Sequence, residues 1–152
     1  MNTSTNKTNT INNTIQVISF SLEKEEYGIN IAQVQEINRM VTITHVPRAQ
    51  KFINLRGQLI PVIDLRLRFG MKKTEYTKNT QIVVTEIGNK RVGIVVDSVA
   101  EVLRIQENQI EETPEIMSEA HSEYINGVEK LDERLIIILD LEKVVPEKEK
   151  ML

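Results

Sequence analysis

Three aspartates stand where apolar runs end, and carboxylates in such places could do chemistry. Asp64, Asp97 and Asp140 each follow a strongly apolar segment. Carboxylates that converge in space can act as general acid and base or hold a divalent metal ion. Carboxylates at strand ends can instead cap a turn by accepting backbone N–H bonds. The capping interpretation is favoured, since Asp64 and Asp140 hold the same place in two similar runs. A small carboxylate-dependent hydrolase is the alternative that these residues keep open.

The other residue types that carry catalysis or bind metals form no pattern. His45 and His121 are the only histidines, and neither has a zinc-binding spacing. The chain has no cysteine that could complete such a site. It has no nucleophile elbow, no P-loop and no dinucleotide-binding glycine motif. The sequence therefore predicts no catalytic residue, no metal ion and no cofactor.

One arginine stands where a protein would display a single side chain to a partner. Arg56 belongs to a predicted tight turn of sequence Asn-Leu-Arg-Gly, residues 54–57. Gly57 can take a positive φ there, and Asn54 can bond the backbone locally. Arg56 either reaches a partner, as arginine does at binding hot spots, or pairs internally with an acidic residue and locks its turn. The sequence alone favours the internal pair slightly.

Two short blocks mix valine with glutamate directly after a buried strand. They are residues 34–37 (Val-Gln-Glu-Ile) and residues 99–102 (Val-Ala-Glu-Val). Each block is either part of the core with one solvated glutamate, or a binding surface in which valine supplies apolar contact and glutamate sets the register. The sequence pattern supports the core interpretation and the binding-surface interpretation equally.

These residues must be positioned by strands, since short apolar runs bounded by turn residues dominate the chain. Strands are expected at residues 16–22, 27–31, 41–46, 59–65, 81–87, 91–96 and 135–141. Residues 31–37 are spaced for one helical turn or a kinked strand. Residues 106–122 are expected to form a loop with some helix, and residues 142–150 a helical turn or two. Residues 1–13 are nearly all asparagine and threonine, and we expect a disordered tail there.

The chain repeats itself imperfectly. Matching residues lie 65 positions apart, among them the pairs Gly28 and Gly93, Val34 and Val99, and Glu36 and Glu101. Residues 135–141 (Leu-Ile-Ile-Ile-Leu-Asp-Leu) echo residues 59–65 (Leu-Ile-Pro-Val-Ile-Asp-Leu). Such a duplication predicts two small barrels of about five strands each. The corresponding lobes would be residues 14–77 and 78–147.

Length and composition exclude several classes of protein. The chain has 152 residues, which suits one domain or two small lobes that share a core. A net charge of −3 and 4% aromatic residues give no basic face or stacking platform for nucleic acid. A β-barrel module that binds nucleic acid is therefore a disfavoured alternative. Without cysteine the chain forms no disulfide, and no apolar run approaches the roughly 20 residues that span a bilayer.

Several motifs resemble the CheW family of bacterial chemotaxis coupling proteins. The first is the Asn-Leu-Arg-Gly turn at residues 54–57, followed by Ile-Pro-Val-Ile-Asp-Leu at residues 60–65. The others are residues 26–29 with 34–37, residues 92–97, and residues 124–127 with 139–141. The motifs stand in the order that the family has, and the resemblance covers a CheW-like domain at residues 14–147.

The resemblance implies an all-β fold of two SH3-like five-stranded β-barrels, packed through a shared hydrophobic core, with short helical segments. It also implies a function without catalysis. Such an adaptor couples the signalling tips of methyl-accepting chemoreceptors to the regulatory domain of the histidine kinase CheA in signalling arrays. The protein would be cytoplasmic, would reach the membrane only through its partners, would not bind nucleic acid and would be monomeric when free.

Taken residue by residue, the family motifs imply two binding surfaces. The receptor-facing surface would contain Val34, Glu36, Arg56, Gly57, Gly93, Val99 and Val102. These residues would line a groove between the lobes, where the tip of a helical hairpin could lay an apolar face. The kinase-facing surface would contain Arg39, Val41 and Ile43.

Overall fold

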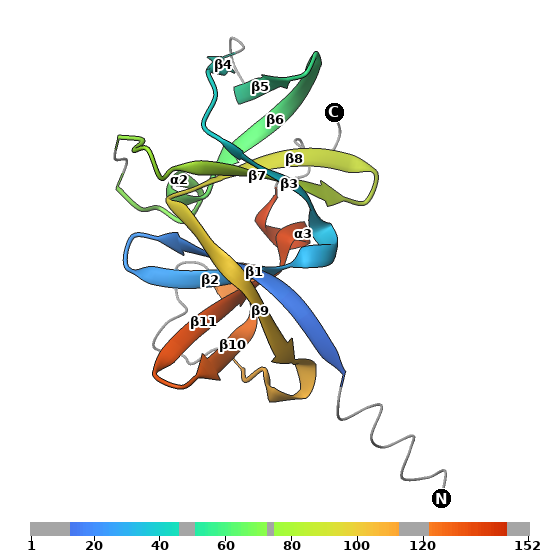
Figure 1. Cartoon of the computed structure of the whole chain (residues 1–152), viewed down its shortest axis with the longest axis vertical. Coiled ribbons are helices and arrows are strands. Elements are labelled where there is room, and N and C mark those ends of the chain that lie inside the picture. Colours follow the sequence, from blue (N-terminus) through green and yellow to red (C-terminus); the bar gives the residue numbers. More distant parts are fainter. Residues whose placement is uncertain (1–12, 46–50, 73–74, 113–121, 146–152) are drawn as a thin grey trace, which may run out of the picture.

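The structure, a computed structural model, describes residues 13–45, 51–72, 75–112 and 122–145. Two β-sheets lie one above the other along the long axis of the molecule (Figure 1). Sheet A has five strands, in the order β10 (Ile125–Leu131), β11 (Arg134–Leu139), β2 (Glu25–Asn30), β1 (Thr14–Leu22) and β9 (Ser98–Gln106). Sheet B has six strands, in the order β3 (Val34–Arg39), β7 (Gln81–Ile87), β8 (Lys90–Val96), β6 (Gln58–Asp64), β5 (Lys51–Leu55) and β4 (Ile43–His45).

Short helices join these strands. They include η1 (Ile31–Gln33), α2 (Leu65–Arg68), η2 (Glu107–Gln109), η4 (Ser122–Tyr124) and α3 (Leu141–Val144). No helix in the described ranges is long and apolar enough to cross a membrane. Apart from Asn13, the tail predicted at residues 1–13 lies outside the described residues, as do parts of the segments predicted at 106–122 and 142–150.

The predicted strands occur close to their predicted places. β7 covers residues 81–87 as expected, because its β-branched residues favour a strand. β6 begins one residue before the predicted start and ends at Asp64, since Leu65 already belongs to α2. Residues 31–37 form the single turn η1 followed by the bent strand β3. The strand predicted at residues 41–46 is the shorter β4, which gives sheet B its sixth strand.

The internal repeat is present in the backbone. β3 pairs with β7 in sheet B through a bulge that leaves Gln35 out of the register. β9 pairs with β1 in sheet A through a bulge at Ala100, 65 positions further along the chain. Both bulges fall in the two blocks that mix valine with glutamate. These blocks therefore bend an edge strand, and a bulge can aim neighbouring side chains in a new direction.

The parallel strand pairs also repeat in one register. Val62 of β6 lies opposite Gly93 of β8, and Ile138 of β11 lies opposite Gly28 of β2. A Cβ atom at Gly93 would lie 3.0 Å from Cγ2 of Ile82 and 3.4 Å from Cγ2 of Val62. The close approach of neighbouring strands therefore requires glycine at this position.

The two copies of the repeat exchange strands. β1 and β2 belong to sheet A, but β3 and β6 of the same copy pair with β7 and β8 in sheet B. β9 and β11 of the second copy belong to sheet A. Each sheet therefore contains both halves of the chain, and neither coincides with residues 14–77 or 78–147. The physical reason is that the bulged edge strand of each copy pairs with the first strand of the other copy.

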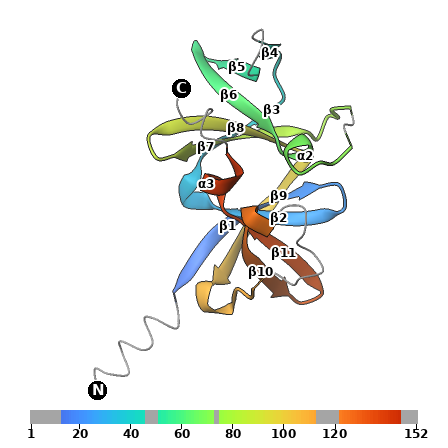
Figure 2. The same cartoon turned by 180° about the vertical axis from the view of Figure 1, so that it is seen from behind.

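A shared hydrophobic core lies between the two sheets. Sheet A contributes buried Ile18, Phe20 and Tyr27, and sheet B contributes buried Val83 and Ile94. α2 and α3 add apolar side chains to the same core, and Figures 1 and 2 both show α3 between the sheets. Burying one such side chain contributes about 1.5–3 kcal/mol. The predicted all-β fold with a shared core is confirmed.

Candidate functional site

The turn between β5 and β6 displays Arg56. Arg56 and Gly57 have positive φ values of 52° and 87°, as a two-residue type I′ hairpin turn requires. The side chain of Asn54 accepts a hydrogen bond of 2.9 Å from the Gly57 N–H, which stabilises the turn. The Arg56 side chain is 65% exposed. The tight turn predicted at residues 54–57 is confirmed, and its arginine stands at the surface.

Arg56 is paired with Glu36 of the edge strand β3. Nη2 of Arg56 lies 2.5 Å from Oε2 of Glu36, and Nη2 of Arg91 lies 3.6 Å from the same oxygen. Asn38 donates a hydrogen bond of 3.2 Å to Oε1 of Glu36. The hydrogen bonds from Arg56 and Asn38 lower the pKa of Glu36, and the bond to Glu36 raises the pKa of Arg56. Both partners are therefore charged at neutral pH.

A polar network extends from this ion pair across sheet B. Arg91 of β8 donates from Nε to Oε1 of Gln35 at 2.6 Å, and from Nη1 to Oε1 of Gln58. Gln35 donates in turn to Glu86 of β7 at 3.0 Å. The bulge in β3 allows Gln35 and its neighbour Glu36 to reach the same arginine. We call Gln35, Glu36, Arg56, Gln58 and Arg91 the Glu36 network.

The Glu36 network has the chemistry of a recognition surface. A guanidinium presents several donors in a fixed fork, and here a carboxylate on a bulged strand holds that fork in place. The network joins side chains of three strands and one turn, so its geometry is set by the sheet. Such an arrangement can offer a charged group to a partner protein in one defined position.

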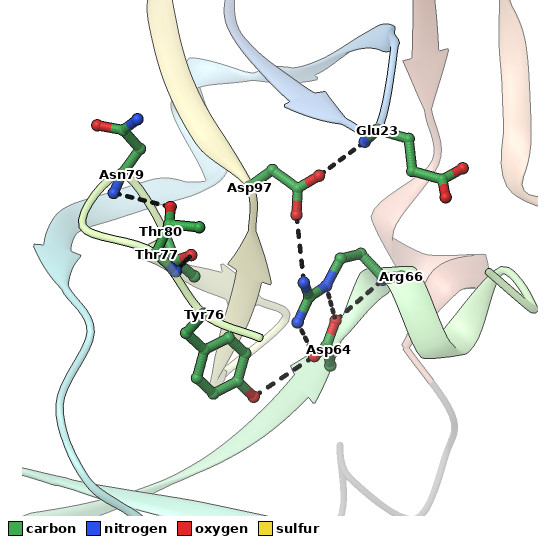
Figure 3. Close-up of polar contacts among 8 residues, drawn as sticks. All are labelled: Glu23, Asp64, Arg66, Tyr76, Thr77, Asn79, Thr80 and Asp97. Carbon is green, nitrogen blue, oxygen red and sulfur yellow. Dashed lines mark hydrogen bonds and ion pairs between the residues drawn. The ribbon is translucent and has the colours of Figure 1, made fainter. Parts of the chain in front are cut away.

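Two of the three aspartates converge, but they do so on an arginine. Nη2 of Arg66 lies 2.9 Å from Oδ2 of Asp64, and Nη1 of Arg66 lies 3.5 Å from Oδ1 of Asp97 (Figure 3). Asp64 also caps α2 by accepting the Arg66 N–H. Asp140 caps α3 by accepting the Glu142 N–H at 3.0 Å. The capping interpretation therefore holds for Asp64 and Asp140, and the three carboxylates do not form one site.

Arg66 is a site residue that the sequence analysis missed. Its side chain is 2% exposed, its guanidinium lies 5.2 Å from the centre of the Tyr76 ring, and its hydrogen bond to Asp64 raises its pKa. A polar pocket of about 410 Å³ opens beside it, lined in part by Ser21, Glu23, Thr80, Asp97 and Ser98. The spacing of Asp64 and Arg66, two residues apart at the end of an apolar run, was the available signal.

Metal binding finds no support in the part of the chain that the structure describes. Within these residues no group of three histidine, aspartate or glutamate side chains could hold a metal ion. His45 ends the short strand β4, and His121 lies outside the described residues.

Comparison with known proteins decides between the remaining classes. A family model described as the CheW-like domain matches residues 16–149. The chain belongs to the CheW family. The chemotaxis protein CheW of Klebsiella aerogenes is 39% identical to it over 138 residues, which cover 88% of this chain and 83% of that protein. The chemotaxis protein CheW of Thermotoga maritima is 35% identical, with 87% and 88% covered.

A solved structure leads to the same family. The crystal structure of the scaffolding protein TtCheW from Thermoanaerobacter tengcongensis has a TM-score of 0.76 to this chain, at 39% identity and over 84% of each chain. The chain is thus a chemotaxis adaptor of the CheW type, a family that does not act by catalysis. This assignment replaces the hydrolase and the nucleic-acid-binding module as interpretations of the sequence.

Four of the residues that the family motifs assign to receptor binding lie close together on sheet B. Glu36, Arg56 and Gly57 come together in and beside the Glu36 network. Val34 begins β3 and packs partly against the shared core, so it offers only part of its side chain to a partner. These residues come from β3 and from the β5–β6 turn, which sheet B brings together from segments about 20 residues apart.

The other three assigned residues lie elsewhere. Val99 and Val102 belong to β9 of sheet A, where Val102 is 47% exposed and Val99 packs partly against the shared core. Gly93 is buried in β8 beside β6, so its assignment to the surface is wrong. The missing side chain at this position serves strand packing, because a Cβ there would press on Ile82.

The three residues assigned to kinase binding follow one another in the segment that runs from β3, at one edge of sheet B, to β4, at the other edge. Arg39 ends β3 and is exposed, and it lines a pocket of about 510 Å³ with residues 77–80. Val41 is 38% exposed in the link between β3 and β4. Ile43 begins β4 and packs partly against the core of sheet B. Arg39 and the Glu36 network therefore share strand β3.

Proposed function

We propose that this protein is a non-catalytic adaptor that couples the signalling tips of methyl-accepting chemoreceptors to the histidine kinase CheA. The observation that carries the proposal is the exposed Arg56 guanidinium, which Glu36 holds in place on a rigid turn in a chain of the CheW family. The protein would act in the cytoplasm and would be held at membrane-bound receptor arrays through its partners.

The receptor-binding surface that we propose combines the exposed parts of two strands. It contains Glu36, Arg56 and Gly57 with the adjoining Val34, and it continues to Val99 and Val102 on β9. Valine side chains would supply apolar contact, and the ion pair would fix the register of the partner. Gly93 is left out because it is buried.

The kinase-binding surface that we propose is the segment with Arg39, Val41 and Ile43, which connects the two edge strands β3 and β4. An exposed sheet edge has unpaired backbone groups and can dock against another protein. With separate surfaces, one adaptor can hold receptor and kinase at the same time. Its binding can shift the kinase between activity states only as far as its affinity for those states differs.

Co-sedimentation with a receptor signalling fragment and CheA tests this function directly. Kinase activity is read in the same samples, with and without the protein. We expect the protein to be needed both for the three-component complex and for receptor control of phosphorylation. A folded protein that binds neither cognate partner would contradict the proposal and would leave only the fold in common with the family.

A further inference from the structure

The chain crosses between the two sheets at two places that the internal repeat makes equivalent. It passes from sheet A to sheet B through η1, which contains Ala32, and from sheet B to sheet A at Asp97 between β8 and β9. Ala32 and Asp97 are 65 positions apart, the spacing of the repeat. When residues 59–65 are aligned with residues 135–141, Asp64 matches Asp140, and the residue two positions on, Arg66, matches Glu142.

Asp97 connects the two sheets through its side chain and its backbone (Figure 3). Its Oδ2 accepts a hydrogen bond of 2.7 Å from the N–H of Glu23, in the β1–β2 turn of sheet A. Its own N–H donates to the Ser21 carbonyl oxygen at 3.1 Å. Its Oδ1 lies 3.5 Å from Nη1 of Arg66, in the helix that continues β6 of sheet B. We call Glu23, Asp97 and Arg66 the inter-sheet clamp.

At the second crossover, Ala32 stands in the place of Asp97, so the equivalent ion pair cannot form there. The N–H of Ala32 donates to Asn30 in its own turn at 2.9 Å, and the Glu142 N–H donates to Asp140 in its own cap. Ala32 has no side chain that could pair with a charge. The same strands, bulge and capped helix therefore form around Ala32 without an ion pair of the kind that joins Asp97 to Arg66. The fold does not require a clamp at this position, and the presence of one at Asp97 calls for another explanation.

The clamp can fix the angle between the two sheets more closely than the apolar core between them does. Hydrophobic burial is not directional, so a core of this kind holds two sheets together without fixing their angle closely. A buried ion pair contributes little net stability, but it can select one arrangement because a displaced charge is left unpaired. At the sheet junction the Arg66 side chain is 2% exposed and the Asp97 side chain 30% exposed, so a displaced Asp97 would remove one of the two carboxylates beside a buried guanidinium.

We propose that Asp97 is a positioning residue that fixes the orientation of sheet A relative to sheet B. This inference rests on the proposed adaptor function, since the orientation matters when surfaces on both sheets are occupied. The receptor surface includes β9 of sheet A, and the kinase surface lies on β3, β4 and the link between them in sheet B. Asp97 would make no direct contact with receptor or kinase. It acts by holding the two surfaces in one mutual geometry.

Spin labels on the two sheets test the orientation without any partner. The chain has no cysteine, so Asn89→Cys in the β7–β8 turn and Glu133→Cys in the β10–β11 turn supply the only labelling sites. We expect a narrow distance distribution in the otherwise unchanged protein and a broader or displaced one with Asp97→Asn. Asp140→Asn is the matched control, because that carboxylate caps α3 and pairs with Lys143 within its own helical turn, and it should leave the distribution unchanged.

A conservative variant separates charge from shape. Asp97→Glu keeps the negative charge and is expected to recover the narrow distribution, whereas Asp97→Asn keeps the shape and loses the charge. Equal distributions for the unchanged protein and Asp97→Asn would overturn the inference. So would an Asp97→Glu protein that behaves like Asp97→Asn, or an Asp97→Asn protein that fails to fold, since the clamp would then serve stability alone.

The functional arm uses the full protein with receptor fragment and kinase. We expect Asp97→Asn to bind each partner separately with an affinity within about twofold of the unchanged protein, as for a substitution outside the contact surface. Receptor control of the kinase should be lost. A loss of affinity for one partner would make Asp97 a contact residue and would overturn the positioning role, as would full receptor control. If the unchanged protein itself fails to couple, the adaptor proposal fails, while the distance measurement still decides the clamp.

Discussion

Arg56 can pair with Glu36 and still contact a partner protein, so the two roles considered for it are compatible. The sequence allowed an internal pair or a reach toward a partner, and the structure has the internal pair with the Arg56 side chain still 65% exposed. A guanidinium has five donors, so one carboxylate does not use all of them. The bond to Glu36 reduces the freedom of a long side chain before a partner arrives, and pre-organisation of this kind lowers the entropy cost of binding.

Arg56→Ala is expected to weaken receptor binding about tenfold or more, the effect typical of an interface hot spot. The fold should be unaffected, because the ion pair is exposed and such pairs add little stability. Titration calorimetry with a receptor signalling fragment measures the change. Arg134→Ala is the matched control, since Arg134 is an exposed arginine on β11 that pairs with Glu26 outside the Glu36 network. Unchanged affinity in a folded Arg56→Ala protein would mean that Arg56 only holds its own turn.

Glu129 is a buried carboxylate in β10, and its unfavourable contribution to the free energy of folding depends on pH. Its side chain is 3% exposed, and its Oε1 has no hydrogen-bond partner among the described residues. Burial, together with repulsion from Glu111, raises the pKa of Glu129 above the ordinary value of 4.5. The folded protein therefore holds this proton more tightly than the unfolded chain does. The resulting penalty on folding is absent below the ordinary pKa and grows as pH rises through the folded pKa.

Glu129→Gln should accordingly stabilise the protein at neutral pH and have little effect in acid. Urea unfolding of both proteins across this pH range gives the difference in free energy of unfolding. Glu133→Gln changes an exposed glutamate on the same hairpin and serves as the control. A difference between Glu129→Gln and the unchanged protein that stays constant with pH would contradict the assignment of the penalty to ionisation.

At the scale of elements, the same aspartate N-cap occurs once beside a buried side chain and once beside an exposed one. Asp64 begins α2 and Asp140 begins α3, each by accepting the N–H two residues on. After Asp64 that residue is the buried Arg66, and after Asp140 it is the exposed Glu142. The same cap therefore neutralises a buried charge in one copy, whereas in the other it begins a helix and faces the exposed Lys143.

Asp140→Ala should destabilise the protein by about 1 kcal/mol, the usual effect of losing an N-cap. Asp64→Ala should destabilise it by about 3–5 kcal/mol, because it removes the closer carboxylate of a buried ion pair and leaves the charge on Arg66 with the more distant Asp97. Urea unfolding of both variants measures the two values. Equal destabilisation would show that the Arg66 pair adds nothing beyond the cap.

The elements also show how far the sequence alone could lead. Runs of β-branched residues predicted β7 at the correct residues. The tight turn at residues 54–57 was also predicted, with a positive φ at Gly57. The repeat predicted that Asp64 and Asp140 hold equivalent places, whereas the two matching bulges were found only in the structure. Hydrophobic patterning tells which face of a strand is buried but not which strand lies beside it, so the exchange of strands between the sheets was missed. Arg66 was missed for a related reason, since a charge beside an apolar run is usually solvated.

The exchange of strands decides how the whole molecule holds together. β1 pairs with β9, β3 pairs with β7, and β6 pairs with β8. Each of these pairs joins one half of the chain to the other, and the shared core draws on both halves as well. The lobes expected at residues 14–77 and 78–147 would each have kept their own strands. A chain built of exchanged strands should instead unfold as one cooperative unit.

Cutting the chain between Lys78 and Asn79 distinguishes these two arrangements. Both residues are exposed in a turn before β7, so the cut itself breaks no strand. Alone, fragment 1–78 would have β1 without β9 and β6 without β8, and isolated hairpins are at best marginally stable in water. We expect neither fragment to give the dispersed amide spectrum of a folded protein. Mixed in equal amounts, the fragments should recover that spectrum, because every missing strand partner is then supplied. A fragment 1–78 that folds alone would mean that its strands can close a sheet without β7, β8 and β9, and the strand exchange would then not be what holds the two halves together.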